Sequence, residues 1–385
     1  MKFTSALIVF LLLFFAGLIF PLQSVAIVDP LSLPNNKVGV HILFPTELQE
    51  ASRLVNANGG DWGYVTIPIQ STDKDLIKWQ SFMDEANKYH IIPIIRLATE
   101  GNYFDTSTWS KPTEADVLDF ANFLNSLEWP TKNRYIIVFN EVNRADEWQG
   151  NPDASEYANI LKYAVDVFKS RNPDFYIISS GLDNASITIP GVSINEYSFL
   201  RQMNDAVPGI FGQIDALGSH SYPNPGFRQP AASQGYESVA SFQYERNLAK
   251  NLSGKDLPVF ITETGWSAFQ VSDTLEASYY QQAFSTIWND SHIIAVTPFL
   301  LFANSEPFKS FSLLSASMSQ TESYKSISQL PKVKGTPMLS PHEFIPSTNQ
   351  PTQAPVKNFD NTQSINNSIH IPPPVKTLLK WMLKI

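Results

Sequence analysis

Short runs of β-branched, aliphatic and aromatic residues recur along the chain, and their repetition limits the folds open to it more than any other feature. Eight runs have the character of buried strands: 38–42, 63–69, 91–97, 135–141, 175–181, 214–220, 257–263 and 293–302. Segments with helical spacing of apolar residues lie between them, for example 47–57, 79–89, 114–127, 155–170 and 276–288. Strand alternating with helix through eight repeats predicts an α/β fold, the (β/α)8 TIM barrel.

The 385 residues, 43% of them apolar, suit one large barrel with added segments or two smaller domains, and the strand series favours one barrel at residues 27–336. From 337 to 374, prolines alternate with Thr, Ser, Asn and Gln, which predicts a disordered linker too polar to form a core. Residues 375–385 form a short basic amphipathic tail. The tail fits either a weak foot on a membrane surface or a frayed end, because so few residues rarely hold a helix alone.

The first 26 residues carry one lysine, a long apolar run and a small-residue exit. This pattern predicts a secretory signal peptide, with an uncleaved N-terminal membrane anchor as the alternative. In both cases the remainder is expected outside the cytoplasm, secreted or anchored at the cell surface. The chain has no cysteine, which excludes disulfides, zinc-thiolate sites and thiol nucleophiles.

The net charge of -9 and the pI near 5.2 leave no basic surface for nucleic acid. The six histidines show no metal-ligand spacing such as His-x-His, which argues against a metal-dependent hydrolase. We therefore expect no metal and no organic cofactor.

Two of the predicted strands, the fourth and the seventh, end in glutamates. The runs are 135–141, ending in Asn140 and Glu141, and 257–263, ending in Glu263. In a parallel barrel these strand ends meet at the face where catalytic groups collect. Two carboxylates there are what glycoside hydrolysis needs, one to protonate the leaving oxygen and one to attack the anomeric carbon. The alternative for each glutamate taken singly is that it merely begins a loop.

On these residues the chain resembles the retaining β-glycosidases of glycoside hydrolase clan A, such as cellulase family 5 and related families. The resemblance covers about residues 37–331 and implies that Glu141 is the acid/base, Glu263 the nucleophile and Asn140 a ligand of the sugar 2-hydroxyl. The acid/base needs a raised pKa and the nucleophile needs to stay ionised. We therefore expect a raised pKa for Glu141 and hydrogen-bond donors around Glu263.

Further polar residues stand at the other strand ends. By the same resemblance, His220 and Tyr222 lie beside the nucleophile, although a packed barrel histidine and a loop tyrosine are the plainer alternative. Arg96 either supports the ionised nucleophile or pairs with a loop acid. His41 either hydrogen-bonds a sugar hydroxyl or fills the barrel floor.

Aromatic residues follow several of the strands, and sugar C–H faces stack on such rings. We expect sugar contacts from Trp148 and Trp266. Many clan members have a tryptophan on the eighth strand, whereas this chain has Phe299 and Phe302 there, so the platform under the reacting sugar falls to Phe302 or Trp266.

The sequence thus predicts a monomeric glycosidase that cleaves β-linked oligo- or polysaccharides by a retaining mechanism. A transglycosylase with the same site, and a carbohydrate-binding surface protein without turnover, remain the alternatives. Sugar identity, linkage and endo or exo action depend on loop geometry that the sequence does not give.

Overall fold

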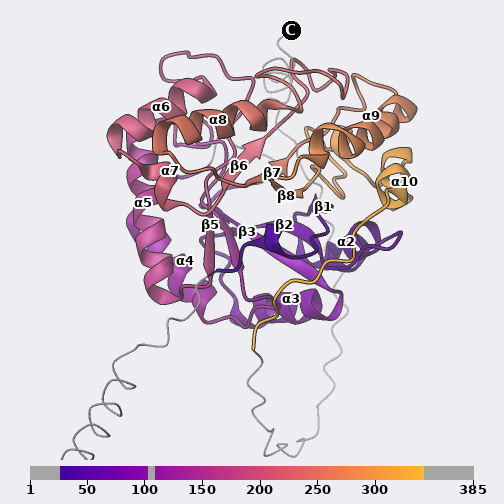
Figure 1. Ribbon diagram of the computed structural model, residues 1–385, viewed down its shortest axis with the longest axis horizontal. Helices are drawn as coiled ribbons and strands as arrows, with labels where there is room; N and C mark the ends of the chain where they lie inside the picture. Colours follow the sequence, from indigo (N-terminus) through magenta and orange to yellow (C-terminus); the bar gives the residue numbers. More distant parts are fainter. Residues whose placement is uncertain (1–26, 103–108, 342–385) are drawn as a thin grey trace, which may run out of the picture.

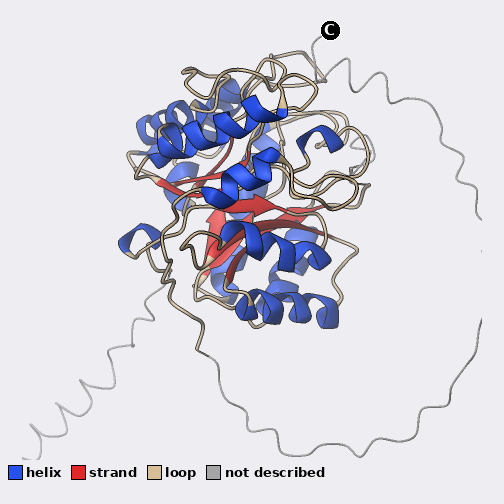
Figure 2. Ribbon diagram, turned by 90° about the vertical axis from the view of Figure 1, so that its right-hand side faces the viewer, coloured by secondary structure: helices blue, strands red, loops and turns tan. Residues whose placement is uncertain are grey.

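The computed structural model describes residues 27–102 and 109–341 and shows strands at the centre with helices around them (Figures 1 and 2). The strands are β1 Gly39–His41, β2 Gly63–Gln70, β3 Ile91–Ala98, β4 Arg134–Ile137, β5 Phe175–Ile178, β6 Leu217–His220, β7 Val259–Glu263 and β8 Ile293–Val296. The α-helices are α2 Leu48–Val55, α3 Leu76–Lys88, α4 Glu114–Asn125, α5 Ala154–Arg171, α6 Glu196–Ala206, α7 Ile210–Gln213, α8 Ser241–Ser253, α9 Asp273–Ser285 and α10 Glu322–Gln329. Short 3-10 turns lie at η1 Pro30–Ser32, η2 Pro45–Glu47, η4 Ile287–Asn289 and η5 Lys309–Phe311.

All strand pairs are parallel, and they form a closed series. Strands β1 to β5 make one ladder and β6 to β8 another. Single parallel bridges join the two ladders, Ile178 to Ala216 between β5 and β6, and Val38 to Val296 between β1 and β8. The predicted (β/α)8 barrel is therefore present, with every strand's C-terminal end at the same rim.

Aromatic side chains fill the inside of the barrel. The Phe260 ring lies 5.4 Å from Tyr135, 6.0 Å from Tyr176 and 6.1 Å from Tyr64, measured between ring centroids, and all four side chains are buried. Each comes from a different strand. Such interior layers make a barrel a packed core rather than a pore, so the strand ends rest on a rigid floor.

Helix α5 illustrates how the outer layer forms. Asp153 precedes it and accepts hydrogen bonds from the backbone N–H groups of Ser155 and Glu156, which satisfies two donors that the first turn leaves open. Its buried face repeats with helical spacing against the strands: Tyr157, Leu161, Ala164 and Phe168. The largest core cluster lies in this space between strands and helices.

Three strands end earlier than predicted. The ladders stop at Ile137, Ile178 and Val296, whereas the apolar runs continue to 141, 181 and 302. The continuing residues remain largely buried, but they hydrogen-bond as loops. For example, Leu301 N donates to His41 O, which folds the chain after β8 back over β1.

The N-terminal end of the barrel is sealed by two segments from opposite ends of the described chain. Val28 and Asn133 exchange two hydrogen bonds, and Gly335 N donates to Asp61 O at 3.0 Å. Past the predicted domain boundary at 336, Met338 O accepts from Lys132 N, and Ser340 hydrogen-bonds Pro130 and Thr131. The chain therefore stays on the barrel four residues beyond that boundary.

The predicted leader at 1–26, the linker from 342 onward and the tail at 375–385 lie outside the described residues. Within 27–102 and 109–341, no helix has both the length and the apolar character to cross a bilayer.

Two buried carboxyl groups, Glu196 and Glu245, lie behind β6 between α6 and α8. Glu245 Oε1 accepts hydrogen bonds from the Ser219 and Ser241 hydroxyls, each at 2.9 Å. Burial raises the pKa of Glu245 to about 7, and burial together with the nearby Glu245 charge raises the pKa of Glu196. The pair thus favours its protonated form, as buried carboxyls without a close cation do.

The contacts of residues 338–340 with residues 130–132 at the N-terminal end of the barrel predict different effects for two truncations. Ending the chain after 341 should leave the melting temperature unchanged, because the removed residues have a composition too polar for core packing. Ending it after 336 removes three hydrogen bonds to residues 130–132, each contributing about 1 kcal/mol, so the melting temperature should fall by several degrees. Calorimetry of both chains measures this, and equal melting temperatures would contradict the seal.

The carboxyl pair predicts a pH dependence of stability. Because the folded-state pKa of Glu245 lies above that of the unfolded chain, folded protein binds more protons, and the free energy of unfolding falls as pH rises from about 4.5 to about 7. Glu245→Gln should be nearly neutral at pH 4.5 and stabilising by about 1–3 kcal/mol at pH 8. Urea unfolding at both pH values measures it, with the exposed Glu85→Gln as control. If Glu245→Gln changed the free energy of unfolding equally at both pH values, the raised pKa of Glu245 would not account for the pH dependence.

Candidate active site

Four polar side chains from four strands converge at the C-terminal rim of the barrel. His41, His220 and Glu263 are the last residues of β1, β6 and β7, and Arg96 lies near the end of β3. A register shift between Ser219 and His220 places His220 opposite Glu263. The rim therefore brings residues from distant parts of the sequence into one buried group.

Glu141 joins this group from the loop after β4 and not from the strand itself. The loop contains two residues with left-handed backbone, Phe139 at φ 68° and Glu141 at φ 34°. Such backbone is strained for residues with a side chain and persists only where the surroundings hold it. Here Glu141 N donates to Gly181 O at 3.0 Å, and the Asn143 side chain hydrogen-bonds both Asp183 and Ile194. The β4 loop is thus fastened to the β5 loop.

Glu263 is surrounded by donors. The Tyr222 hydroxyl donates to Oε2 at 3.1 Å, while His41 Nε2 and Arg96 Nη1 lie 3.6 and 3.8 Å from Oε1. Asn184 Nδ2 in turn donates to Tyr222 O and fixes the tyrosine's loop. The donors expected around the nucleophile are in these positions, and Glu263 is 7% exposed.

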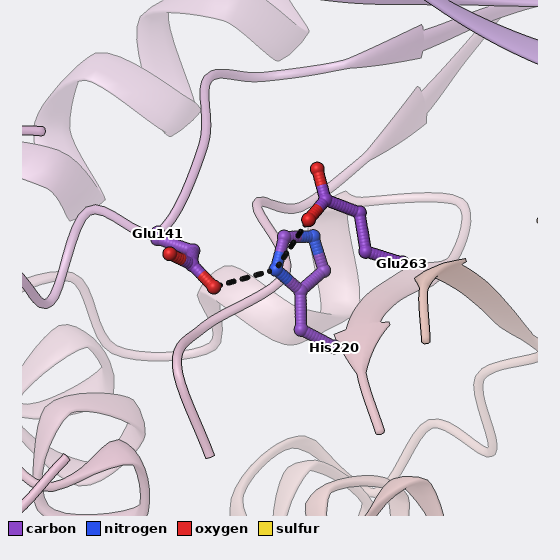
Figure 3. Close-up of side chains that lie close together, drawn as sticks. All are labelled: Glu141, His220 and Glu263. Atoms are coloured by element: carbon purple, nitrogen blue, oxygen red, sulfur yellow. Dashed lines mark hydrogen bonds and ion pairs between the residues drawn. The ribbon is translucent and has the colours of Figure 1, made fainter. Parts of the chain in front are cut away.

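The His220 imidazole lies between the two glutamates (Figure 3). Its Nδ1 is 3.0 Å from Glu141 Oε1 and 3.8 Å from Glu263 Oε2. One carboxylate oxygen of each glutamate and a His220 ring nitrogen all lie within 4.8 Å of one another. The two carboxylates therefore lie close together, with the His220 ring nitrogen beside both.

Arg144, three residues after Glu141, hydrogen-bonds the Glu141 oxygen that does not face His220. Its Nη1 donates to Glu141 Oε2 at 2.6 Å. Its Nε and Nη2 donate to the two oxygens of Asp146 at 3.0 and 2.5 Å, a two-pronged pairing that holds the guanidinium plane in place. Sequence reasoning missed Arg144, although its i+3 spacing from Glu141 was a usable signal.

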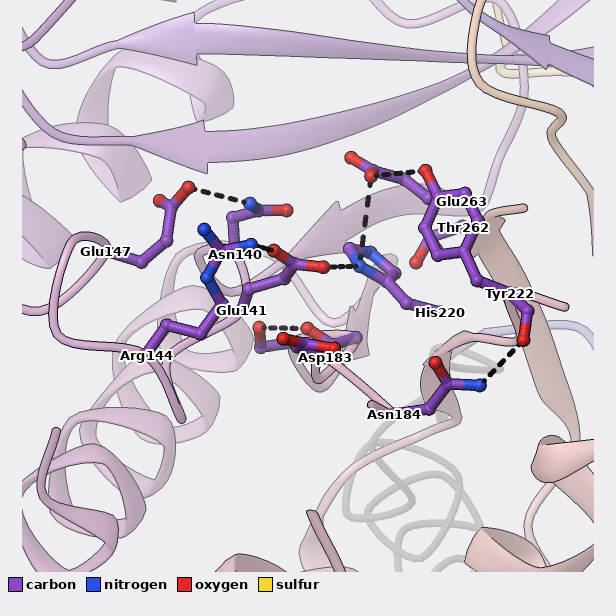
Figure 4. A network of polar contacts seen from close by, with 12 residues as sticks. Asn140, Glu141, Arg144, Glu147, Asp183, Asn184, His220, Tyr222, Thr262 and Glu263 are labelled. Atoms are coloured by element: carbon purple, nitrogen blue, oxygen red, sulfur yellow. Dashed lines mark hydrogen bonds and ion pairs between the residues drawn. The ribbon is translucent and has the colours of Figure 1, made fainter. Parts of the chain in front are cut away.

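Asn140 lies beside a second unpredicted residue, Glu147 (Figure 4). Asn140 Nδ2 donates to Glu147 Oε1 at 3.2 Å, and within the described chain no group hydrogen-bonds its buried Oδ1. Burial and the nearby Asp146 raise the pKa of Glu147 to about 8. Asn140 Oδ1 is thus an acceptor that a ligand hydroxyl could use. The Asn140 amide group is held through Nδ2 by Glu147, whose raised pKa favours the neutral carboxyl.

The charge distribution differs from the expectation for the two glutamates. Burial alone would raise the pKa of Glu141, but Arg144 and His220 more than offset it and lower the pKa to about 2. Burial raises the pKa of Glu263, with Glu141 adding to the rise and His220 and Arg96 opposing it. The expected raised pKa of Glu141 is therefore wrong for this ligand-free arrangement, because Arg144 was not foreseen.

The pKa of His220 is shifted in the opposite direction to that of Glu141. Burial alone would lower its pKa, but the carboxylates of Glu263 and Glu141 raise it. The raised pKa favours the imidazolium form of His220 beside the two carboxylates. His41 differs: burial, followed by the charges of Arg96 and His220, lowers its pKa, which favours a neutral ring.

The three residues Glu141, His220 and Glu263 could in principle present ligand atoms to a metal. Zinc takes ligands at about 2.0–2.2 Å, which requires neighbouring ligand atoms roughly 3.5 Å apart. The cations Arg144 and Arg96 already lie against the two carboxylates. This surrounding positive charge disfavours a further cation between the carboxylates.

The aromatic expectations need correction. Trp266 is 0% exposed, stacks among side chains of α9 and η4, and donates from Nε1 to Gln229 O. Trp148 is 1% exposed and packs on Tyr157. Neither ring offers a face to a sugar, because both loops fold back onto the helical shell.

Phe302 also packs against the core between strands and helices. Phe299 instead lies at the rim, its ring centroid 5.1 Å from that of His41. Because β8 ends at Val296, the third residue beyond it faces the site rather than the sixth. This makes Phe299 the aromatic neighbour of the site that the prediction placed at Phe302.

No protein-family model matches this sequence, and a search of curated proteins finds no match. Solved structures do match. A family 39 glycoside hydrolase from Bacteroides cellulosilyticus aligns over 80% of this chain and 65% of its own length, with 19% identity and a TM-score of 0.53. The chain thus spans somewhat less than two thirds of that enzyme.

Two further structures cover more of their own length. A family 128 endo-β-1,3-glucanase from Sorangium cellulosum aligns over 77% of this chain and 98% of its own, with 14% identity and a TM-score of 0.51. A family 5 subfamily 18 protein from Streptomyces cattleya, in complex with GlcNAc, aligns over 77% and 80%, with 18% identity and a TM-score of 0.53. The chain has the TIM-barrel fold of the clan A glycoside hydrolases.

Proposed function

We propose that this chain is a retaining β-glycosidase. The observation that carries the proposal is the pair of carboxylates, Glu141 and Glu263, whose oxygens face each other within 4.8 Å at the rim of the barrel. Retaining enzymes hold their two carboxyl groups about 5–5.5 Å apart, whereas inverting enzymes leave room for a water between groups about 6.5–9.5 Å apart. The short separation supports attack by a carboxylate on the sugar itself.

We propose the following roles for the two glutamates. Glu263 attacks the anomeric carbon, and Tyr222, Arg96 and His41 hold its carboxylate in place. Glu141 protonates the departing oxygen. It then takes a proton from the water that releases the sugar from Glu263, which returns both glutamates to their starting states.

We assign substrate contacts to two groups near the glutamates. Asn140 Oδ1 is the acceptor for a sugar hydroxyl, and Phe299 is the apolar surface beside the nucleophile. We propose a β-linked oligo- or polysaccharide as substrate. The structural neighbours act on different sugars, so they leave the identity of this sugar open. The apolar run within residues 1–26 supports action outside the cytoplasm.

The two glutamates should fail differently when they are mutated. Glu141→Ala removes the proton donor, so hydrolysis of aryl β-glycosides with poor leaving groups should fall by about 10²–10⁴-fold, and those with good leaving groups should still form the intermediate. Added azide should then give a glycosyl azide of retained configuration. Glu263→Ala should impair every substrate, and azide should give the inverted product.

Product stereochemistry by NMR and the leaving-group dependence of kcat/KM measure this difference. The starting substrates come from a screen of aryl β-glycosides and polysaccharides. A 2-fluoro glycoside inactivator should label Glu263. Labelling of another residue, or the same azide product from both variants, would contradict the roles, and a wild type without turnover on the whole screen would overturn the proposal.

Gly181 gives a test of the placement of His220. A Cβ at this position would lie 2.1 Å from His220 Cδ2, with the glycine's backbone fixed by its bond to Glu141 N. Gly181→Ala should displace the imidazole, reduce kcat by more than about tenfold and destabilise the fold by about 1–3 kcal/mol. Gly212→Ala is the matched control, since no atom lies within 4 Å of the added methyl. Unaltered kinetics of Gly181→Ala would show that His220 is not needed in this position.

A further inference from the structure

Both oxygens of the Glu141 carboxylate are occupied by donors. Oε2 accepts from Arg144 Nη1 at 2.6 Å and Oε1 faces His220 Nδ1 at 3.0 Å. A protonated carboxyl needs one oxygen that can carry a hydrogen. The lone pair of Oε2 that accepts from Arg144 cannot also carry a hydrogen, and the guanidinium itself has donors but no acceptor.

Oε1 is therefore the oxygen at which a neighbouring titratable group can exchange a proton with Glu141. Nδ1 of His220 is the group hydrogen-bonded there, so the two residues form one pair that shares a proton. With the Arg144 charge on the opposite oxygen, the proton stays on His220 and Glu141 stays ionised. The lowered pKa of Glu141 and the raised pKa of His220 agree with this distribution.

Arg144 is fixed independently of Glu141. Asp146 binds two of its nitrogens, and its backbone is bridged to Ser193 in the neighbouring loop. Its side chain is 12% exposed. The guanidinium is thus a preorganised charge rather than a surface cation that happens to reach the carboxylate.

We propose that Arg144 is a positioning residue that sets whether Glu141 or His220 holds the catalytic proton. The catalytic consequence rests on the proposed function. Charged and titratable groups from every neighbouring element take part in this balance: Arg144, Asp146 and Glu147 from the β4 loop, His41 from β1, Arg96 from β3, Asp183 from the β5 loop, His220 and Tyr222 from β6 and its loop, Glu245 from α8, and Glu263 from β7.

The proton movements balance. His220 gives its Nδ1 proton to Glu141 Oε1, so both become neutral, and Glu141 passes this proton to the leaving oxygen as the glycosidic bond breaks. In the second half, Glu141 takes a proton from water, and the proton returns to His220. Arg144 stabilises the carboxylate before and after each transfer, which makes Glu141 a stronger acid when it is protonated.

The test on ligand-free protein is NMR titration of glutamate δ-13C and histidine ring 15N signals, with Glu141→Gln and His220→Gln for assignment. In Arg144→Gln the pKa of Glu141 should rise by at least one unit, because an opposite charge within 4–6 Å shifts a carboxyl by about 1–3 units. The proton should move from His220 toward Glu141. Arg144→Lys should restore most of the shift. Arg53→Gln, which removes an exposed ion pair on α2, should leave both titrations unchanged.

The kinetic test is the pH profile of kcat/KM on an aryl β-glycoside with a poor leaving group. In Arg144→Gln its alkaline limb should move up by about one unit, since a lost positive charge raises the proton affinity of the pair. The profile on a substrate with a good leaving group, which needs no acid, should keep its alkaline limb. A purely structural role would lower both rates without moving either limb.

A second variant keeps the inference testable if Arg144→Gln fails to fold. Asp146→Asn removes a negative charge but keeps one acceptor oxygen for the Arg144 guanidinium, so the pKa of Glu141 should move downward, opposite to Arg144→Gln. Unchanged titrations in both variants would overturn the inference even if glycosides are hydrolysed. Shifted titrations in a chain that hydrolyses no glycoside would overturn the proposed function and leave the role of Arg144 intact.

Discussion

The pairing of buried carboxylates with cations is the interaction on which the rim of this barrel depends. Glu141 and Glu263 are less than a tenth exposed, and an unpaired ionised carboxylate at such depth would be protonated or would disrupt the site. Arg144, Arg96 and His220 supply the compensating charge. Two local irregularities of the backbone bring these charged groups together. The left-handed backbone at Glu141 aims its carboxylate at His220, and the register shift after Ser219 sets His220 opposite Glu263.

The barrel supports this arrangement by being rigid elsewhere. Phe260 and the three tyrosines close the interior below the site, and the segments around Val28 and Met338 close the opposite end. Strained loop backbone persists only where its surroundings determine it, and the hydrogen bonds of Asn143 to the β5 loop provide that determination. The site therefore combines strand ends with the β4 loop, and its geometry follows from parallel strands that cannot slide past one another without breaking their register.

Hydrophobic periodicity and strand rank were enough to predict the barrel and the meeting of its two glutamates. All eight strands are present, and the glutamates after the fourth and at the end of the seventh do lie together. The prediction failed where apolar residues continue beyond the end of a hydrogen-bonded strand. Residues 138–141 and 297–302 are loops, so the aromatic residue at the rim is Phe299 and not Phe302. Trp266 looked like a sugar platform because loops can expose rings, but packing under α9 buries it. The lowered pKa of Glu141 was missed because the i+3 spacing of Arg144 suggests a contact but does not reveal the left-handed backbone at Glu141.

The buried carboxyl groups of this protein fall into two classes, those with a raised pKa and those with a lowered pKa, and Asn140 lies next to one of each. Glu147, Glu245 and Glu276 have close cations too few or too distant to offset burial, and their pKa values rise to about 7 or 8. Glu141, with Arg144 and His220 on its oxygens, has a pKa near 2. Asn140 hydrogen-bonds the neutral kind and precedes the ionised kind in sequence. In the proposed function, a sugar hydroxyl at Asn140 would therefore meet an uncharged partner, while the bond to be cleaved would lie beside charged groups. Electrostatic stabilisation is then strongest where charge develops in the transition state, rather than along the whole sugar ring.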